Sequence, residues 1–370
     1  MSHALDQISI QGYKSIRELK EFKLGKLNVL IGANGAGKSN LVDFFRMLRA
    51  MAEGGLRSFV TNGGGGDCFF YNGPKVTRLI SAELNFGQNA YRFSLAPTAD
   101  SEIMVQSEAS LWKGGVANWR EKGGGGKEAS LRSWKGEKSG RGDWLSIDGN
   151  VHEAIASWVV YHVHDTSFTA PMRRECSVAD HRELRPDASN IAPFLYQLKA
   201  KHPTRYQRII QTIQLIAPFF ADFLLEPEKK GENELMRLQW QQQGSSFPFQ
   251  PWQFSDGTIR FICLATALLQ PAPPSTVVID EPELGLHPVA LEALAALIHE
   301  ASSRTQLVIS TQATTLLDHF DADHVIVVER SDGASVFRRL EASDLEQWIA
   351  DFSVGELVRK NIIETGPTHA

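Results

Sequence analysis

Residues 32–39 of the chain read GANGAGKS. This stretch matches G-x-x-x-x-G-K-[ST] at every fixed position, and it lies between the apolar run 27–31 and an amphipathic segment that begins near Lys38. Glycines allow a backbone to curl with its N–H groups facing phosphate oxygens, and the N-terminus of a following helix adds partial positive charge. The stretch therefore predicts a phosphate-binding loop between a strand and a helix, in preference to a glycine-rich turn without a ligand.

The residue types in this loop suggest individual roles. Lys38 is expected to reach the β- and γ-phosphates of ATP, and Ser39 to hold Mg²⁺. Asn34 and Asn40 are polar neighbours that tune the loop. The predicted nucleotide-binding residues of this segment are Gly32, Asn34, Gly35, Ala36, Gly37, Lys38, Ser39 and Asn40.

A second segment, DEPELGLHP at 280–288, follows the apolar run 276–279. Asp280 stands at the expected C-terminal end of a strand, which suits coordination of the Mg²⁺ held by Ser39. Glu281 is expected to orient or deprotonate the attacking water. Alone, the segment could equally be a solvated acidic turn, but beside a complete phosphate loop the catalytic interpretation is favoured. Since the two motifs lie near opposite ends of the chain, the N-terminal and C-terminal segments must come together to form the nucleotide site.

Residues 254–258, FSDGT, form a third piece at the start of an amphipathic helix. The helix N-terminus with Ser255, Asp256 and Gly257 could bind an anion. One nucleotide does not need two phosphate-binding sites from the same chain. We therefore expect a homodimer in which this segment covers the partner's ATP. Taken alone, an ordinary helix cap is the simpler interpretation.

Gln312 follows a predicted strand at 305–310 and is placed to sense the γ-phosphate. Its amide can form hydrogen bonds but cannot exchange a proton. The predicted catalytic residues are therefore Glu281, Lys38 and Gln312, and the predicted metal ligands are Ser39 and Asp280.

Composition limits the class of protein. The chain has 370 residues and a net charge of −5, so its overall charge does not indicate nucleic-acid binding. Cys68, Cys176 and Cys263 are scattered, which argues against a disulfide framework or a zinc site. No apolar run has the ~18 residues of a membrane span, and the N-terminus lacks a signal-peptide core. We therefore expect a cytoplasmic protein.

Hydrophobic periodicity predicts an α/β protein with a largely parallel sheet. Helices are expected near 38–52 and over 188–224, and a β-hairpin over 78–96. The expected strands are 8–13, 15–24, 27–31, 158–163, 276–280, 305–310 and 323–329, and helices are expected at 258–269, 288–302 and 313–319.

Residues 113–143 are rich in glycine and carry eight Lys or Arg against four Asp or Glu. We expect a mobile loop or hairpin tip. Trp112, Trp119, Trp134 and Trp144 lie in or beside it, and basic residues interleaved with aromatics can bind nucleic acid. A solvated loop whose tryptophans pack locally against the sheet is favoured.

His162, His164 and Asp165 are a possible metal cluster, because alternate strand residues share a face. The neighbouring sequence offers no further ligand, so a structural role is favoured.

Together, residues 32–39, 254–258, 276–281, 283–288 and 310–312 resemble the Walker A loop, signature, Walker B strand, D-loop and switch of ABC-type ATPases of the RecF/SMC kind. More closely, the whole chain is similar to a bacterial family of stand-alone predicted ATPases with an AAA-type core, often labelled RecF-like. The stretches that carry this closer likeness are VYHVHDTS (160–167), LRPDASNIAPFLY (184–196), FSDGTIRFICLATALLQP (254–271) and IDEPELGLHP (279–288).

The resemblance implies a P-loop NTPase of the ABC-ATPase type, with a mixed sheet, an antiparallel β subdomain and an inserted helical lobe. It implies residues 1–112 and 246–370 as the two parts of the ATPase lobe, 113–150 as an insert and 151–245 as a mainly helical lobe. It also implies slow ATP hydrolysis, homodimerisation on ATP and a role in DNA repair or genome maintenance. The alternative is a regulator in a phage-defence or toxin system, with a protein effector instead of DNA as partner. No membrane partner is expected.

The chain departs from the ABC pattern in three places. The signature reads Phe254-Ser255-Asp256-Gly257 where Leu-Ser-Gly-Gly is common, and Gln312 stands where a histidine is usual. No clear Q-loop glutamine is found, and Asn62 or Asn72 are the nearest candidates.

Overall fold

The computed structural model describes residues 4–114, 118–139, 146–349 and 351–364, and in it both chain ends form one central sheet. The strand order is β17-β16-β3-β15-β14-β8. The strands are β3 (Leu27–Ile31), β8 (Val159–Tyr161), β14 (Thr276–Asp280), β15 (Gln306–Thr311), β16 (Val325–Ser331) and β17 (Ala334–Arg339). All pairs are parallel except β16 with β17, so the predicted largely parallel sheet is confirmed.

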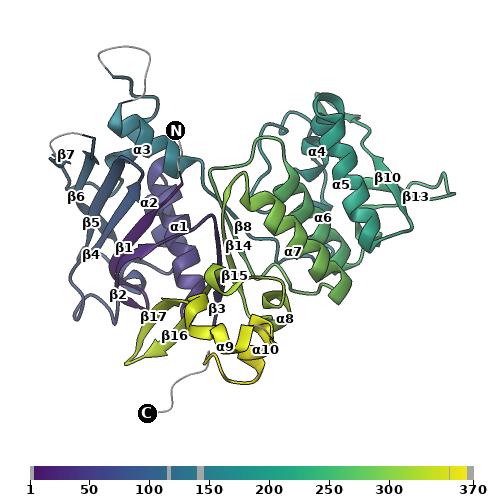
Figure 1. The fold of residues 1–370 in the computed structure, drawn as a ribbon. Coiled ribbons are helices and arrows are strands. Elements are labelled where there is room, and N and C mark those ends of the chain that lie inside the picture. The colour runs from purple at the N-terminus through teal and green to yellow at the C-terminus, as the bar shows by residue number, and fades with distance from the viewer. Residues whose placement is uncertain (1–3, 115–117, 140–145, 350, 365–370) are drawn as a thin grey trace.

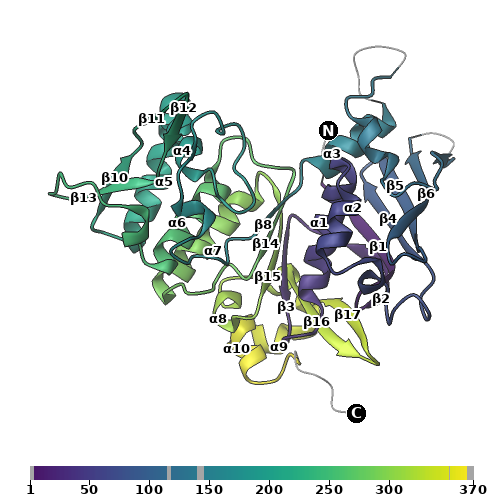
Figure 2. The ribbon, with the colours of Figure 1, turned by 180° about the vertical axis from the view of Figure 1, so that it is seen from behind.

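Helices cover both faces of this sheet, which explains why its central strands read as continuous apolar runs. Leu30 and Val278 point into the core shared with α1 (Lys38–Glu53) and α3 (Ile147–Ala156). Their neighbours Val29 and Ile279 point into the core shared with α6 (Asp256–Leu269) and α7 (Pro288–Ser302). Figures 1 and 2 show α1 and α3 on one side of the sheet and α6 and α7 on the other.

An antiparallel sheet packs over α1, as predicted for the β subdomain. Its order is β2-β1-β4-β5-β6-β7. The strands are β1 (Gln7–Tyr13), β2 (Ile16–Lys23), β4 (Ile80–Phe86), β5 (Asn89–Pro97), β6 (Ile103–Trp112) and β7 (Arg120–Glu121). The predicted hairpin is β4–β5, which turns at Gly87. The short helix α2 (Leu56–Asn62) follows α1, and Asn72 lies in a turn.

The inserted lobe contains α4 (Ile191–Lys201) and α5 (Pro203–Ile216). Its strands are β9 (Cys176–Ser177), β10 (Phe220–Leu224), β11 (Glu228–Lys230), β12 (Asn233–Met236) and β13 (Gln239–Gln242). The helix predicted through residue 224 was wrong at its end. Ala217 precedes Pro218, and a residue before proline disfavours the helical conformation, so α5 ends and 220–224 pairs with β13 instead.

The described part of the lysine- and glycine-rich insert packs against the rest of the protein, whereas we expected a mobile loop or hairpin tip. Its β7 pairs with β6, and a 3₁₀ turn at Ser130–Trp134 places Leu131 and Trp134 in the core beside α1. Trp119 lies against the guanidinium of Arg92. Trp144 and residues 115–117 and 140–143 lie outside the described residues.

The predicted division at residues 150 and 151 does not coincide with a boundary in the fold. Helix α3 crosses it and packs on α1, and β8 is an edge strand of the central sheet. The domain division itself stays a prediction.

The described C-terminal residues form α8 (Thr314–Leu317), α9 (Glu346–Ile349) and α10 (Val354–Arg359) below the sheet in Figure 1. All three cysteines are free thiols, and burial raises the pKa of Cys263 to about 12. Within the described residues, no helix combines the length and apolar character needed to cross a membrane.

Candidate nucleotide site

The loop 32–39 connects β3 to α1, as the motif predicts, and close contacts leave no room for a side chain at Gly32 and Gly37. A Cβ on Gly32 would lie 2.1 Å from the carbonyl oxygen of Val328. A Cβ on Gly37 would lie 2.0 Å from Ser335 Oγ, and Gly37 has a φ of +110°. The loop therefore packs so closely on β16 and β17 that side chains are excluded there.

Two serines that the motif does not predict hold the loop in place. Asn40 donates to Ser15 Oγ over 2.6 Å, and Ser15 Oγ lies 2.6 Å from Ser335 Oγ. Ser335 Oγ in turn donates to the carbonyl of Ala36 over 2.5 Å. Asn40 thus acts by anchoring the loop. Neither serine belongs to a recognisable pattern in the sequence.

Lys38 is the buried cation of the loop, with 4% of its surface exposed. Its Nζ donates to the carbonyls of Gly32 at 2.7 Å and Ala33 at 3.2 Å. Burial lowers the pKa of Lys38, and the carboxylates of Glu281, Asp280 and Glu283 oppose that shift. These carboxylates belong to the segment after β14, which the strand order β3-β15-β14 places at the same edge of the sheet as the loop after β3. Asn34, Gly35 and Ser39 are exposed on the loop, where a ligand can reach them.

The acidic segment follows β14 directly. Glu281 has a φ of +44°, a conformation that side-chain-bearing residues rarely adopt, and its N–H donates to the Ser310 carbonyl over 2.7 Å. The Gln312 side-chain amide donates to the Glu281 carboxylate. The structure thus brings together Glu281 and Gln312, as the sequence predicts.

Glu283 ties the acidic segment to the end of β15. Its Oε1 accepts hydrogen bonds from Thr311 Oγ1 at 2.7 Å and from the N–H groups of Gln312 at 2.9 Å and Ala313 at 3.3 Å. The Glu283 side chain thus makes its hydrogen bonds within the chain.

Among the described residues, three buried polar atoms at this edge have no hydrogen-bond partner: Asp280 Oδ1, Glu283 Oε2 and Ser310 Oγ. Buried polar atoms are normally paired, so orphans concentrated at one place indicate a missing partner. Oxygen donors beside an exposed hydroxyl at Ser39 are the ligand set that Mg²⁺ prefers. The residues present therefore fit the Mg²⁺ and phosphates that a P-loop site binds.

The segment 254–258 starts α6. Ser255 caps the helix, because its Oγ accepts from the N–H of Thr258 over 3.1 Å, and Asp256 pairs with Arg173 over 2.9 Å. A Cβ on Gly257 would lie 2.4 Å from the carbonyl of Gly285, so this segment packs on residues 283–288. Among the described residues, the side-chain hydrogen bonds of Ser255 and Asp256 do not reach the loop 32–39.

Two buried arginines connect the start of α6 to neighbouring loops by hydrogen bonds. Neither arginine was identified from the sequence. Arg173 donates to the carbonyls of Thr166 and Phe254 as well as to Asp256. Arg260 donates to the carbonyls of Val163 at 3.0 Å and His164 at 2.8 Å and to that of Leu284. Burial lowers the pKa of Arg260. The available signal for Arg260 was a lone cation inside the apolar helix pattern IRFICLATALL.

The histidines after β8 lie at the same edge of the sheet as Asp280, because β8 pairs with β14. His164 Nε2 lies 2.8 Å from the carbonyl oxygen of Asp280, and His162 Nδ1 lies 3.1 Å from Arg46 Nη2. Burial, together with nearby His164 and Arg46, lowers the pKa of His162. Asp165 instead accepts from the N–H of Ser167 in a local turn.

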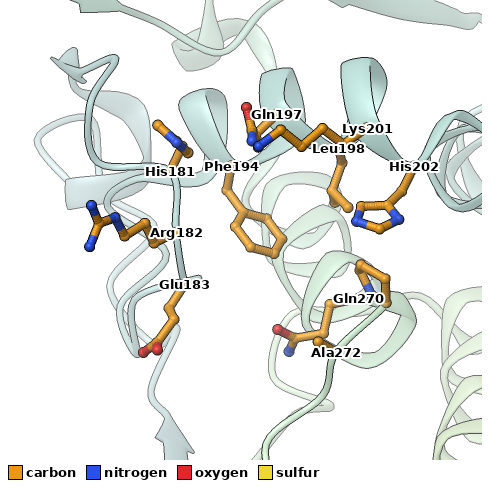
Figure 3. A pocket seen from close by; sticks show the side chains of 11 residues that line it. His181, Arg182, Glu183, Phe194, Gln197, Leu198, Lys201, His202, Gln270 and Ala272 are labelled. Carbon is orange, nitrogen blue, oxygen red and sulfur yellow. The ribbon is translucent and has the colours of Figure 1, made fainter.

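A separate pocket of about 520 Å³ lies in the inserted lobe, as Figure 3 shows. It is formed by α4, the loop before it and the residues that enter β14. Its lining includes Arg182, Phe194, Lys201 and Gln270. The acidic segment follows the other end of β14, so this pocket is not part of the nucleotide site.

The phosphate loop after β3 and the acidic segment after β14 lie at the same edge of the parallel sheet, with β15 between the two strands, which is the arrangement of a P-loop nucleotide-binding fold. Residues 27–318 match the family described as "AAA domain, putative AbiEii toxin, Type IV TA system", and the chain belongs to this family. The expected AAA-type core and the resemblance to SMC-type ATPases are thus confirmed.

Solved structures agree on the fold. The chain is similar to an SmcHead bound to the C-winged helix domain of ScpA, with a TM-score of 0.56, 16% identity and coverage of 93% of this chain and 99% of that chain. It is also similar to the Smc head domain with an extended coiled coil bound to the C-terminal domain of ScpA, derived from Pyrococcus furiosus. That match has a TM-score of 0.53 and 15% identity, and covers 94% of this chain and 98% of that chain. No curated protein sequence matches the chain.

Proposed function

We propose that the chain binds ATP with Mg²⁺ and hydrolyses it slowly, and that it uses the two states as a conformational switch. One observation carries this proposal: the buried Lys38, at the end of the loop after β3, lies at the same edge of the parallel sheet as the carboxylates after β14, with β15 between the two strands. A buried cation shared by a phosphate loop and a carboxylate cluster is the arrangement that phosphoryl transfer needs.

The residues divide the work as follows. Lys38 exchanges the carbonyls of Gly32 and Ala33 for phosphate oxygens when ATP enters. Ser39 and Asp280 would hold Mg²⁺, which supplies positive charge to the phosphate oxygens. Glu281 accepts a proton from the attacking water, or orients it.

Gln312 holds the Glu281 carboxylate by a hydrogen bond, and its amide is available to the γ-phosphate. Because an amide cannot take up a proton, Gln312 positions and senses but does not act as a base. A movement of Gln312 on binding of the γ-phosphate would therefore shift the position of Glu281. It would also shift Glu283, which accepts a hydrogen bond from the backbone N–H of Gln312.

The proposed switch is a homodimer closed by two ATP molecules. It is supported by the side-chain hydrogen bonds of Ser255 and Asp256, which among the described residues go to Thr258 and Arg173 and not to the loop 32–39 of the same chain. In a dimer, the N-terminus of α6 would face the partner's phosphates, where its partial positive charge is useful. Gly257 packs on Gly285, so a change at 283–288 is transmitted to this helix start.

Phosphate release measured with Mg-ATP tests the activity. We expect slow hydrolysis that is lost in Glu281→Gln and Lys38→Ala. Phosphate release by Glu281→Gln at the rate of the unmodified protein would contradict the assignment of the base.

For the cellular role we propose DNA repair or genome maintenance, with DNA as the partner of the ATP-bound dimer. The support is the SMC-head fold. The insert is a poor candidate for the DNA-binding element. Its Lys122 and Lys127 already pair with Asp148 and Glu102, and its Trp134 is buried. ATP-dependent DNA binding whose log affinity falls linearly with log salt concentration would support this role.

The second candidate is a sensor that controls a protein effector in a phage-defence or toxin system. The description of the family as a putative AbiEii toxin of a type IV TA system favours it. The two similar SMC heads are each bound to a domain of ScpA, which shows that this fold can carry a protein partner. Absence of ATP-dependent DNA binding, with a defined protein retained by the Glu281→Gln variant only when ATP is present, would favour this role.

A further inference from the structure

His162, His164 and Asp280 form a cluster of metal-ligand side chains beside the phosphate loop. One ligand atom from each residue lies within 4.8 Å of the other two. Asp280 ends β14 and the histidines follow β8, and these strands are parallel neighbours with Tyr161 paired to Ile279. Sheet pairing therefore supplies Asp280 as the carboxylate of the cluster in place of Asp165, which accepts from the N–H of Ser167 in a local turn.

The hydrogen bonds of the two imidazoles leave a nitrogen lone pair on each. A carbonyl oxygen accepts, so the Nε2 of His164 that faces the Asp280 carbonyl carries the proton and its Nδ1 carries the lone pair. An arginine only donates, so the Nδ1 of His162 that faces Arg46 also carries a lone pair. This is the protonation pattern that a metal-binding histidine requires.

Asp280 provides an independent sign of a missing ligand. The residue is 8% exposed, and its buried Oδ1 has no hydrogen-bond partner in the part of the chain that the structure describes. A buried carboxylate oxygen without a donor is costly unless a cation or an ordered water satisfies it.

We propose that His162, His164 and Asp280 bind a first-row transition-metal ion, for which Mn²⁺ serves as the probe. Mg²⁺ prefers oxygen ligands, whereas imidazole nitrogen favours transition metals. The inference deepens the proposed nucleotide site, because Asp280 belongs to both.

Arg46 regulates access to this metal site. Its guanidinium holds His162 Nδ1 and also pairs with Asp43 over 2.8 Å, so it can release the histidine and keep a carboxylate partner. A metal ion and Arg46 compete for the same lone pair, and both are cations. Removal of the Arg46 side chain should therefore tighten metal binding.

The test uses full-length protein without a histidine tag and without nucleotide. Mn²⁺ binding is measured from the loss of the free-ion electron paramagnetic resonance signal. We expect about one tightly bound Mn²⁺ per chain, with ¹⁴N coupling from imidazole in the electron spin echo envelope. His162→Ala/His164→Ala should weaken binding by about 10-fold or more, and Arg46→Ala should strengthen it.

His181→Ala is the matched control, since His181 lies in the inserted lobe away from this cluster, and it should bind Mn²⁺ normally. Bound Mn²⁺ without ¹⁴N coupling, or a double variant that binds like the unmodified protein, would overturn the proposal. Circular dichroism verifies that each variant is folded. If the double variant is unfolded, the ¹⁴N coupling of the unmodified protein alone decides the question.

Fluorescent-ATP binding separates this inference from the proposed function. If nitrogen-coupled Mn²⁺ binds but ATP does not, the metal site stands and the ATPase proposal fails. If Mg-ATP binds and is hydrolysed but Mn²⁺ shows no nitrogen coupling, the metal site alone is wrong.

Discussion

The carboxylate of Glu283 accepts a hydrogen bond of 2.9 Å from the backbone N–H of Gln312. The same oxygen also accepts from the Thr311 hydroxyl, so one acidic side chain fixes the end of β15 against the segment that follows β14. This side chain thus joins the segment after β14 to the end of β15, the two segments that contribute Glu281 and Gln312 to the proposed nucleotide site.

Glu283→Ala removes this acceptor and leaves the Thr311 hydroxyl and the Gln312 N–H without it, whereas the Ala313 N–H keeps Thr311 Oγ1 as an acceptor. We expect the free energy of unfolding to fall by about 1–3 kcal/mol, and kcat to fall because Gln312 is no longer held. Urea denaturation measures the first effect and phosphate release the second. Glu292→Ala, at an exposed position of α7, is the control and should change stability by less than about 0.5 kcal/mol. Equal stabilities for the two variants would contradict the prediction.

Glu281→Gln should trap an ATP-bound dimer. The amide cannot accept a proton from the attacking water, so ATP remains bound and the dimer persists. Light scattering with Mg-ATP should show a doubled mass for this variant, whereas Glu292→Gln should behave like the unmodified protein. A monomeric Glu281→Gln protein under saturating ATP would reject the dimer switch.

Lys38→Ala should reduce ATP affinity by about 100-fold or more, because Lys38 is the buried cation of the phosphate loop. Titration with fluorescent ATP measures the change. Lys26→Ala removes an exposed cation immediately before β3 and serves as the matched control, with unchanged affinity. Comparable losses in both variants would indicate a general charge effect instead of a specific phosphate contact.

Arg173→Ala and Asp256→Asn should differ although the two side chains form one ion pair. Arg173 has a side chain that is 3% exposed and also donates to buried carbonyls, so its loss should cost at least about 3 kcal/mol. Asp256 is 68% exposed, so its neutralisation should cost less than about 1 kcal/mol. Chemical denaturation of both variants tests this order, and a larger loss for Asp256→Asn would refute it.

Gly257→Ala is expected to destabilise the protein although alanine favours a helix by about 1 kcal/mol. The new Cβ would lie 2.4 Å from the Gly285 carbonyl, and such overpacking costs about 1–3 kcal/mol. A fall in Tm with loss of ATPase activity is the expected result. A rise in Tm would show that the contact between α6 and residues 283–288 is loose.

Local patterns in the sequence predicted much of this structure. GANGAGKS requires a glycine loop between a strand and a helix, and the apolar runs before it and before Asp280 are long enough to be buried strands. These features depend on neighbouring residues, so backbone geometry and periodicity suffice. The helix predicted over 220–224 was wrong because Pro218 and the pairing with β13 outweighed the apolar pattern.

The arrangement of the site came from tertiary structure. Which strand lies beside β14 depends on sheet order, and no local pattern states that β8 occupies that place. That pairing brings His162 and His164 to Asp280, and the packing of α6 brings Gly257 to Gly285. The sequence by itself determined that a phosphate loop and an acidic strand exist, because short-range chemistry defines them. Only the folded chain decided which distant side chains share the site, because burial of both sheet faces sets the order of the strands.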